Sequence, residues 1–272
     1  MKQGNEFTLN HFNLNGKIAI VTGAGTGLGS VFARALATAG ATVIVADINI
    51  ETAQKTSIAI TDKGGIAVAT EVDVTNPDSV ESLIDFAVAN YQHIDILINN
   101  AGIASPAHRV AEMPIEDWDR VNAVNTRGVF LCTRAALPKM VEQNRGVIIN
   151  IASVAALVGV DNNLSAVAAN YSASKGAVAS FTRQVAVEYG EEGIRCNAIA
   201  PGWHLGTQLG QEALPMTEGA LEAMVDKLES LTPLKRTGHP EELAGLAVYL
   251  ASEASSFMTG QVIAHDGGWC SW

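Results

Sequence analysis

Residues 17–29 read Lys-Ile-Ala-Ile-Val-Thr-Gly-Ala-Gly-Thr-Gly-Leu-Gly. The first half is an apolar, β-rich run that is typical of a strand buried on both faces. The second half places glycines at Gly23, Gly27 and Gly29, and residues 30–39 then show apolar side chains at helical spacing. A glycine turn between strand and helix lets the backbone approach a pyrophosphate at the helix N-terminus. The stretch predicts a nucleotide-binding turn, and the alternative is a plain glycine turn, because the commoner spacing is Gly-x-Gly-x-x-Gly.

Strand and helix patterns alternate from this stretch to the end of the chain. The further strands are expected at residues 41–46, 66–70, 94–98, 146–151, 194–200 and 261–264. The helices are expected at residues 30–39, 51–63, 76–91, 114–144 (either continuous or interrupted near Gly128), 171–191, 218–230 and 240–252. This alternation predicts an α/β fold of the Rossmann type, a doubly wound parallel sheet of about seven strands with helices on both faces. We expect one domain over residues 1–272, with a substrate loop and helix inserted around residues 203–231.

Composition restricts the partners of the chain. It has 272 residues, of which 48% are hydrophobic and 17% charged, with a net charge of −11. Phosphate binding needs clustered cations, so this charge argues against nucleic acid and anionic membranes. No apolar run approaches the roughly 18 residues of a membrane span, and residues 1–15 do not resemble a secretory signal. Three widely spaced cysteines, Cys132, Cys196 and Cys270, suit a reducing cytoplasm and show no metal-ligand spacing.

Polar or turn-forming residues stand where the expected strands end. Ligands of open parallel sheets bind beyond the carboxyl ends of the strands, so these residues are candidates for one common site. They are Asp47, Asp73, Asn99, Ser153 and the Pro201-Gly202 pair.

Asp47 favours one type of dinucleotide. It comes 18 residues after Gly29, where a carboxylate can accept hydrogen bonds from the adenine ribose and repel a 2′-phosphate. Thr26, where an arginine could meet that phosphate, is neutral. The sequence therefore predicts NAD rather than NADP, and the alternative for Asp47 is a helix N-cap. Asp73 is expected to bond the adenine amine, or merely to end its strand.

Tyr171 and Lys175 stand four residues apart in Asn-Tyr-Ser-Ala-Ser-Lys-Gly, residues 170–176. On a helix this spacing places both side chains on one face. A neighbouring ammonium favours the phenolate, so we expect the tyrosine pKa to fall below its usual value of about 10. Such a tyrosine can act as an acid or base at an alcohol or carbonyl oxygen. Taken alone, the pair also fits an ordinary exposed helix surface.

The motifs together resemble the short-chain dehydrogenase/reductase family over about residues 14–269. In order along the chain, they are Thr22-Gly23-x-x-x-Gly27-x-Gly29, Asn99-Asn100-Ala101-Gly102, Asn125, Ser153, Tyr171-x-x-x-Lys175 and Pro201-Gly202.

The resemblance implies a role for each matched residue. Tyr171 would be the acid/base, and Lys175 would lower its pKa and bind the nicotinamide ribose. Ser153 would hold the substrate oxygen, and Asn125 would anchor a proton-relaying water. The substrate would meet Ser153, Tyr171 and Trp203. The cofactor would meet Gly23, Thr26, Gly27, Leu28, Gly29, Asp47, Asp73, Val74, Asn99, Ala101, Gly102, Tyr171, Lys175, Pro201, Gly202, His204 and Thr207.

The sequence departs from the family pattern in two places. Ser153 and Tyr171 are 18 residues apart, several more than the family usually shows. The extra length falls in residues 159–169, which should border the substrate. The family often has a threonine five residues after the proline of Pro-Gly. Here that position is Gly206, and Thr207 follows it.

Three functions are compatible with these motifs. The first is an NAD-dependent oxidoreductase that interconverts a secondary alcohol and a ketone, on a polyol, sugar or aldonate, because Asp266-Gly267-Gly268-Trp269 is similar to the chain end of such members. The second is an oxidoreductase of the same family that acts on an apolar substrate, a 3-oxoacyl thioester or steroid. Its substrate site would be lined by Leu205, Leu209, Leu214 and Met216. The third is a nucleotide-binding sensor or scaffold without turnover. The resemblance also implies a homotetramer or homodimer that pairs through the helices holding Asn125 and Tyr171.

Overall fold

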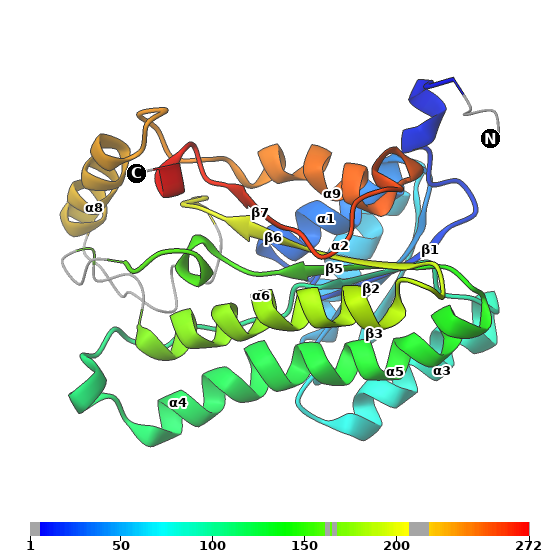
Figure 1. The fold of residues 1–272 in the computed structure, drawn as a ribbon, viewed down its shortest axis with the longest axis horizontal. Helices are drawn as coiled ribbons and strands as arrows, with labels where there is room; N and C mark the ends of the chain where they lie inside the picture. The colour runs from blue at the N-terminus through cyan, green and yellow to red at the C-terminus, as the bar shows by residue number, and fades with distance from the viewer. Residues whose placement is uncertain (1–5, 161–163, 165–167, 207–217, 272) are drawn as a thin grey trace.

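A parallel β-sheet forms the centre of the computed structural model, which describes residues 6–160, 164, 168–206 and 218–271. Within these residues the sheet has seven strands in the order β3-β2-β1-β4-β5-β6-β7. Every neighbouring pair is parallel (Figure 1). The strands are β1 (Ile18–Thr22), β2 (Thr42–Asp47), β3 (Ile66–Glu71), β4 (Ile96–Asn99), β5 (Gly146–Ile151), β6 (Ile194–Pro201) and β7 (Val262–His265).

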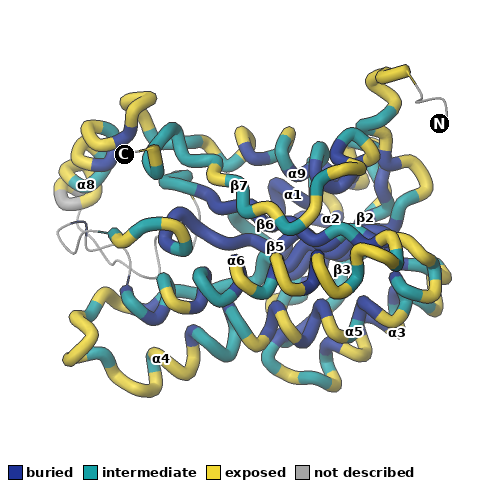
Figure 2. The backbone as a smooth tube through the Cα atoms, viewed as in Figure 1, coloured by how far each residue is buried: buried dark blue, intermediate teal, exposed yellow. Residues whose placement is uncertain are grey.

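Helices cover both faces of the sheet (Figure 1). One face carries α1 (Gly27–Thr38), α2 (Ile50–Thr61) and α9 (Ala244–Ala251). The other carries α3 (Pro77–Tyr91), α5 (Val129–Glu142) and α6 (Ala169–Tyr189). Alternate strand residues enter the two cores, so the central strands are buried throughout (Figure 2). The expected Rossmann-type α/β fold is therefore confirmed.

The helix expected at residues 114–144 is divided into three parts. They are α4 (Ile115–Asn122), a π-helical turn at Ala123–Gly128 and α5. The π turn leaves Asn125 fully buried and Gly128 against Val74, where a Cβ would approach the valine side chain to 2.8 Å. Single π turns inside α-helices occur frequently at functional sites.

Other boundaries differ from the expectation by a few residues. Helix α6 begins at Ala169, two residues before Tyr171. The expected helix near residues 218–230 is α8 (Glu218–Leu231). Strand β4 begins at Ile96, two residues later than expected, and His93 and Asp95 before it take part in a cluster of charged and polar side chains.

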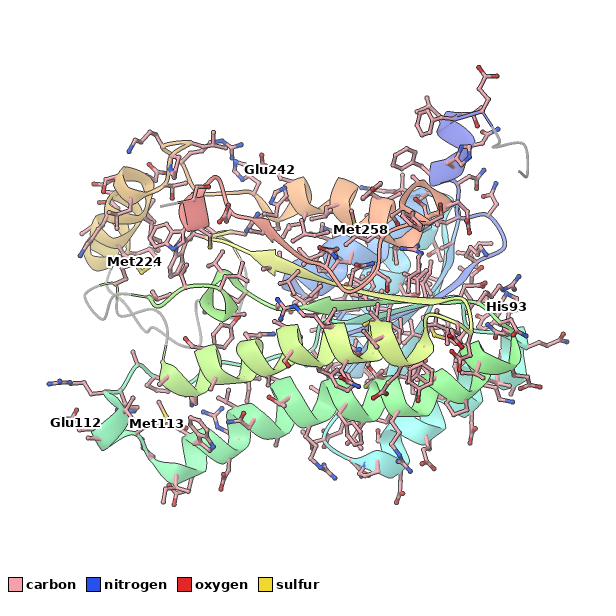
Figure 3. The ribbon with its side chains drawn as sticks, in the orientation of Figure 1. His93, Glu112, Met113, Met224, Glu242 and Met258 are labelled. Atoms are coloured by element: carbon pink, nitrogen blue, oxygen red, sulfur yellow. The ribbon has the colours of Figure 1, made fainter. Side chains whose placement is uncertain are left out.

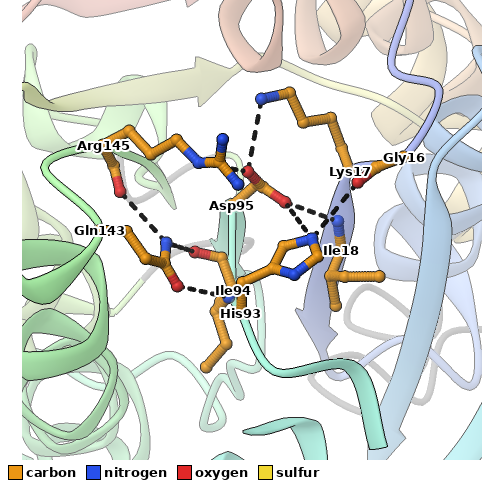
Figure 4. Close-up of polar contacts among 8 residues, drawn as sticks. All are labelled: Gly16, Lys17, Ile18, His93, Ile94, Asp95, Gln143 and Arg145. Carbon is orange, nitrogen blue, oxygen red and sulfur yellow. Dashed lines mark hydrogen bonds and ion pairs between the residues drawn. The ribbon is translucent and has the colours of Figure 1, made fainter.

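This cluster lies at the edge of the sheet where the strands begin (Figure 4). The Asp95 side chain is 5% exposed and lies 3.3 Å from Lys17 Nζ, 3.2 Å from His93 Nε2 and 3.1 Å from Arg145 Nε. Asp95 also accepts the Ile18 backbone N–H at 3.0 Å. One buried carboxylate thus ties together the starts of β1, β4 and β5, opposite the edge that carries the candidate site.

In the part of the chain that the structure describes, no helix is long and apolar enough to cross a membrane. The same residues contain no cluster of three or more His, Cys, Asp or Glu side chains that could hold a metal ion.

Candidate active site

The glycine turn after β1 is shaped for close approach of a ligand. Gly23 and Gly27 have φ of +61° and +51°, a backbone conformation that residues other than glycine rarely adopt. A Cβ on Gly29 would overlap the Gly23 carbonyl oxygen, so the turn and helix α1 can pack only if Gly29 has no side chain. The N-terminus of α1 opens directly beyond the turn, as the phosphates of a dinucleotide require. Thr26 is the N-cap residue of this helix, and Leu28 packs partly buried against the core.

Two side chains that the sequence reasoning did not assign hold this turn against β4. Asn100 donates from Nδ2 to the carbonyls of Thr22 and Gly23 at 3.0 and 2.9 Å. In return, Thr22 Oγ1 accepts the backbone N–H groups of Asn100 and Ala101 at 3.1 and 3.2 Å. Asn100 follows Asn99 directly, and this asparagine pair after the predicted strand is the sequence feature from which the role of Asn100 could have been inferred.

Asp47 lies at the edge of the glycine turn. Its Oδ2 accepts the Gly25 N–H at 2.8 Å, and its Oδ1 accepts the Asn49 N–H at 3.0 Å. The N-cap of α2 is Asn49, whose Oδ1 accepts the N–H groups of Glu51 and Thr52. Asp47 is therefore not the helix cap, and its carboxylate stands beside the turn in which a dinucleotide would lie.

Asp73 and Asn99 make mainly internal contacts. Asp73 Oδ1 accepts both the N–H and the hydroxyl of Thr75, at 2.9 and 2.7 Å, in a local turn. Asn99 is 2% exposed and donates from Nδ2 to Thr133 Oγ1 and Asn150 Oδ1, at 3.0 and 2.8 Å. The Asn99 side chain thus fixes β4 to α5 and β5 beneath the site, and its role in holding a nucleotide through the strand stays a prediction.

The structure brings Tyr171, Lys175 and Ser153 together. Lys175 is 4% exposed, and its Nζ lies 5.6 Å from the centroid of the Tyr171 ring. The same Nζ donates to the Ile151 carbonyl at the end of β5, at 2.8 Å. Ser153 follows that strand and is hydrogen-bonded to the Tyr171 side chain. The helix spacing and the strand end thus bring the three side chains together, and the acid/base role of Tyr171 stays a prediction.

The predicted direction of the Tyr171 pKa is wrong. Burial raises the pKa of Tyr171 to about 12, and the hydrogen bond with Ser153 only partly opposes this. Burial also lowers the pKa of Lys175 from 10.5 to about 8. Desolvation disfavours the charged form of each group, and it outweighs their mutual attraction here. At neutral pH the site therefore holds a neutral phenol beside an ammonium.

Asn125 lies beside this group on the π turn. Its Oδ1 accepts the Ile103 N–H at 2.8 Å, and its Nδ2 donates to the Ile103 carbonyl at 2.9 Å and to Ser174 Oγ at 3.1 Å. A Cβ on Gly102 would lie 3.3 Å from Asn125 Oδ1 and 3.4 Å from Lys175 Nζ. Gly102 therefore separates the amide from the ammonium, and a side chain there would crowd both.

The residues after β6 lie against the C-terminal segment. Gly202 donates its N–H to the His265 carbonyl at 3.0 Å. His204 contacts the Gly202 carbonyl through Nδ1 and His265 Nδ1 through Nε2, both at 3.2 Å. The Trp203 ring meets the Trp269 ring edge-on at 5.5 Å. Trp203 and His204 line a cavity of about 300 Å³ together with Arg236 and Glu242, and Glu242 is labelled in Figure 3.

His204 thus has its partners within the protein, and burial lowers its pKa, so the ring is neutral. Its assignment to the cofactor, and that of Trp203 to the substrate, stay predictions. Thr207, Leu209, Leu214 and Met216 lie outside the described residues, as do residues 161–163 and 165–167 of the loop before α6.

The chain forms a doubly wound sheet with a glycine turn at the carboxyl end of β1 and a Tyr–Lys–Ser group near this turn. These features together are those of a dinucleotide-binding oxidoreductase. The family model described as "Enoyl-(Acyl carrier protein) reductase" matches residues 23–270. The chain belongs to the short-chain dehydrogenase/reductase family.

Relatives that act on different alcohols are similar over nearly the whole chain. A cis-4-hydroxycyclohexanecarboxylate dehydrogenase of Sinomonas cyclohexanicum is 38% identical over 93% of this chain and 96% of its own. A D-threitol dehydrogenase of Mycolicibacterium smegmatis is 36% identical over 99% of both chains. The crystal structure of a gluconate 5-dehydrogenase from Burkholderia cenocepacia, in complex with NADP and tartrate, superposes with a TM-score of 0.88. It is 37% identical, and the match covers 97% of this chain and 99% of that one.

Proposed function

We propose that this protein interconverts a secondary alcohol and its ketone with NAD, and that the alcohol is a polyol, sugar or aldonate. The observation that carries the reaction is the meeting of Tyr171, Lys175 and Ser153 at the carboxyl edge of the sheet. The bound nicotinamide supplies the hydride chemistry. The chain's own residues must then orient the substrate oxygen and handle its proton.

The protonation states suit one direction at neutral pH. Because its pKa is raised to about 12, Tyr171 is a neutral phenol that can donate its proton to the oxygen of a ketone as it becomes an alkoxide. In the other direction, Tyr171 must first lose its proton before it can accept one from the alcohol. The nearby Lys175 ammonium favours that loss, and the Ser153 hydroxyl is placed to share the substrate oxygen.

Asp47 supports NAD over NADP. Its carboxylate is fixed at the glycine turn by the Gly25 N–H, and its sequence neighbours Ile48 and Asn49 are neutral, as is Thr26. A 2′-phosphate at this edge would be repelled by the carboxylate with no adjacent cation in the sequence to offset it. Asp47→Ser should therefore raise kcat/KM for NADP relative to NAD, and an unchanged ratio would remove Asp47 from this role.

Similarity to the threitol and gluconate enzymes supports a polyol, sugar or aldonate substrate. Similarity to the cyclohexanecarboxylate enzyme favours a second candidate, a cyclic secondary alcohol. The test is turnover followed at the absorbance band of reduced nicotinamide, with NAD and NADP each paired with polyols, sugars, aldonates, cyclic alcohols, steroids and 3-oxoacyl thioesters. Nucleotide binding without turnover on any of them would favour a sensor instead.

Tyr171→Phe should abolish turnover and leave nucleotide affinity nearly intact. Tyr189→Phe, on the same helix, is the matched control because it also removes one phenolic oxygen from a partly buried tyrosine. Near-normal turnover in Tyr171→Phe would remove this residue from the acid/base role.

A homodimer or homotetramer is part of the same proposal. Helices α5 and α6 run side by side on the outside of the molecule (Figure 1), and Phe130 meets Phe181 edge-on at 6.3 Å. Phe130 and Val187 are 46% and 80% exposed, so a second copy could cover an apolar surface here. Sedimentation at micromolar protein should show a species larger than the monomer, and a monomer would contradict the proposal.

A further inference from the structure

The backbone of Tyr171 is held on both sides by side chains that are themselves fully buried. Tyr171 is the third residue of α6, so its N–H is one of the donors that a helix leaves without an internal partner. The N-cap residue is Ala168, whose methyl side chain cannot accept this hydrogen bond. Asn170 Oδ1 accepts the Tyr171 N–H instead, at 2.8 Å.

Asn170 is in turn anchored from outside its own helix. Its Nδ2 donates to Ser105 Oγ at 2.9 Å and to the Asp117 carbonyl of α4 at 3.1 Å. Asn170 is 0% exposed and Ser105 is 4% exposed, so water cannot replace these contacts without opening the structure. One amide side chain thus fixes the start of α6 to α4 and to the segment that follows β4.

The carbonyl side of Tyr171 is held through a second chain of bonds. Ser174 Oγ donates to the Tyr171 carbonyl at 2.7 Å and accepts from Asn125 Nδ2 at 3.1 Å. Asn125 is bonded to both backbone groups of Ile103. Both chains of bonds therefore end in residues 103–105, which follow the Ala101-Gly102 pair assigned to the cofactor.

We infer that Asn170 and Ser105 are positioning residues that hold the Tyr171 phenol at its place beside Lys175 and the substrate oxygen. This inference rests on the proposed function for its kinetic consequence, but not for the geometry. A displacement of about 1 Å at a reacting group costs on the order of 100-fold in rate. A buried clamp on the first turn of α6 is therefore expected to appear in kcat rather than in nucleotide affinity.

The first test compares Asn170→Ala with a control on the same helix. Thr182→Val removes a fully buried hydroxyl that bonds Asn150 Nδ2 at 2.9 Å, far along α6 from Tyr171. Both variants should lose thermal stability. Only Asn170→Ala should lower kcat, by about 10- to 100-fold, with nucleotide Kd within about twofold of wild type. Equal kcat in the two variants, or a loss confined to nucleotide Kd, would overturn the inference.

The pH profile separates positioning from general destabilisation. If Asn170→Ala moves the phenol away from the Lys175 ammonium, the phenolate is less favoured, so alcohol oxidation should fall by a larger factor at pH 7, where Lys175 is charged, than at pH 9. Asn170→Ser keeps a side-chain oxygen acceptor for the Tyr171 N–H without burying a charge, and it should recover part of kcat. An equal loss at both pH values together with no recovery would show that Asn170 is merely structural.

Ser105→Ala tests the outer anchor of Asn170. Because both residues act through one chain of bonds, the double variant should be about as slow as Asn170→Ala alone. Multiplicative losses would contradict a shared path. Hydrogen exchange of the Tyr171 amide, faster in Asn170→Ala than in Thr182→Val, tests the clamp even if wild type turns over nothing. If wild type shows no turnover, the proposed function fails, but the exchange experiment still tests the role of Asn170. Unchanged exchange of the Tyr171 amide in Asn170→Ala would refute that role.

Discussion

Lys175→Met tests whether burial of the ammonium destabilises the folded protein. Wild-type Lys175 is 4% exposed with its pKa lowered from 10.5 to about 8, and Met has a similar length without a charge. The substitution also removes the hydrogen bond from Nζ to the Ile151 carbonyl. That loss applies at every pH, whereas the cost of burying the charge does not, so the pH dependence isolates the charge.

The direction in which stability changes with pH follows from the pKa of Lys175 in the folded chain and in the unfolded chain. Below about pH 8 the ammonium is charged in both the folded and the unfolded chain, and folding bears the full desolvation cost. Between about pH 8 and 10.5 the unfolded chain binds the proton and the folded chain does not, so stability rises with pH. A pKa lowered from 10.5 to about 8 corresponds to about 3 kcal/mol. Wild type should gain about this much over Lys175→Met between pH 7 and 10.5.

The assay is urea unfolding of both proteins at several pH values without nucleotide, with the difference in free energy of unfolding plotted against pH. Most other titrating groups are common to both proteins and largely cancel in this difference. Lys139→Met, at a lysine side chain that is 40% exposed on α5, controls for the substitution itself. A flat difference between wild type and Lys175→Met, or one that falls with pH, would refute the argument that burial sets the Lys175 pKa.

Three further outcomes are expected. Gly29→Ala places a methyl group on the Gly23 carbonyl oxygen, so nucleotide affinity should fall at least about tenfold, measured by fluorescence titration. Asp95→Asn removes the charge from the ion-pair cluster but keeps an acceptor for Ile18, so the free energy of unfolding should fall by about 1–3 kcal/mol in urea, with nucleotide Kd unchanged. Alcohol oxidation by wild type should rise from pH 7 to pH 8, where Lys175 is still largely an ammonium and the Tyr171 pKa lies above the range, and a pH-independent kcat would count against Tyr171 as the base.

The sheet was predictable because its evidence is local. Each buried strand is an apolar run bounded by turn residues, and the alternation with helices determines that the strands are parallel. The glycine turn was predictable for the same reason, because Gly23, Gly27 and Gly29 all lie within the short segment that forms the turn. The start of α6 was misplaced by two residues because its N-cap, Ala168, carries no capping side chain.

The inner contacts of the site were not predictable from spacing. Asn170 and Ser105 are 65 positions apart, and nothing near either residue indicates that they meet. The Tyr171 pKa was misjudged for a related reason. The i to i+4 spacing shows the attraction to Lys175, but the sequence does not show how little water reaches the two groups, and desolvation decides the direction.

The π turn at Ala123–Gly128 constrains how this chain can be recombined with its relatives. A π turn holds one residue more than the α-helix that would replace it, and one residue corresponds to about 100° of rotation. Deleting a single residue there would restore a regular helix and swing α4 around the axis of α5. The Asp117 carbonyl would leave Asn170, and the Asn125 amide would leave Ile103. Chimeras that exchange α4 must therefore conserve the residue count of this turn as well as Asn125 and Gly128 within it.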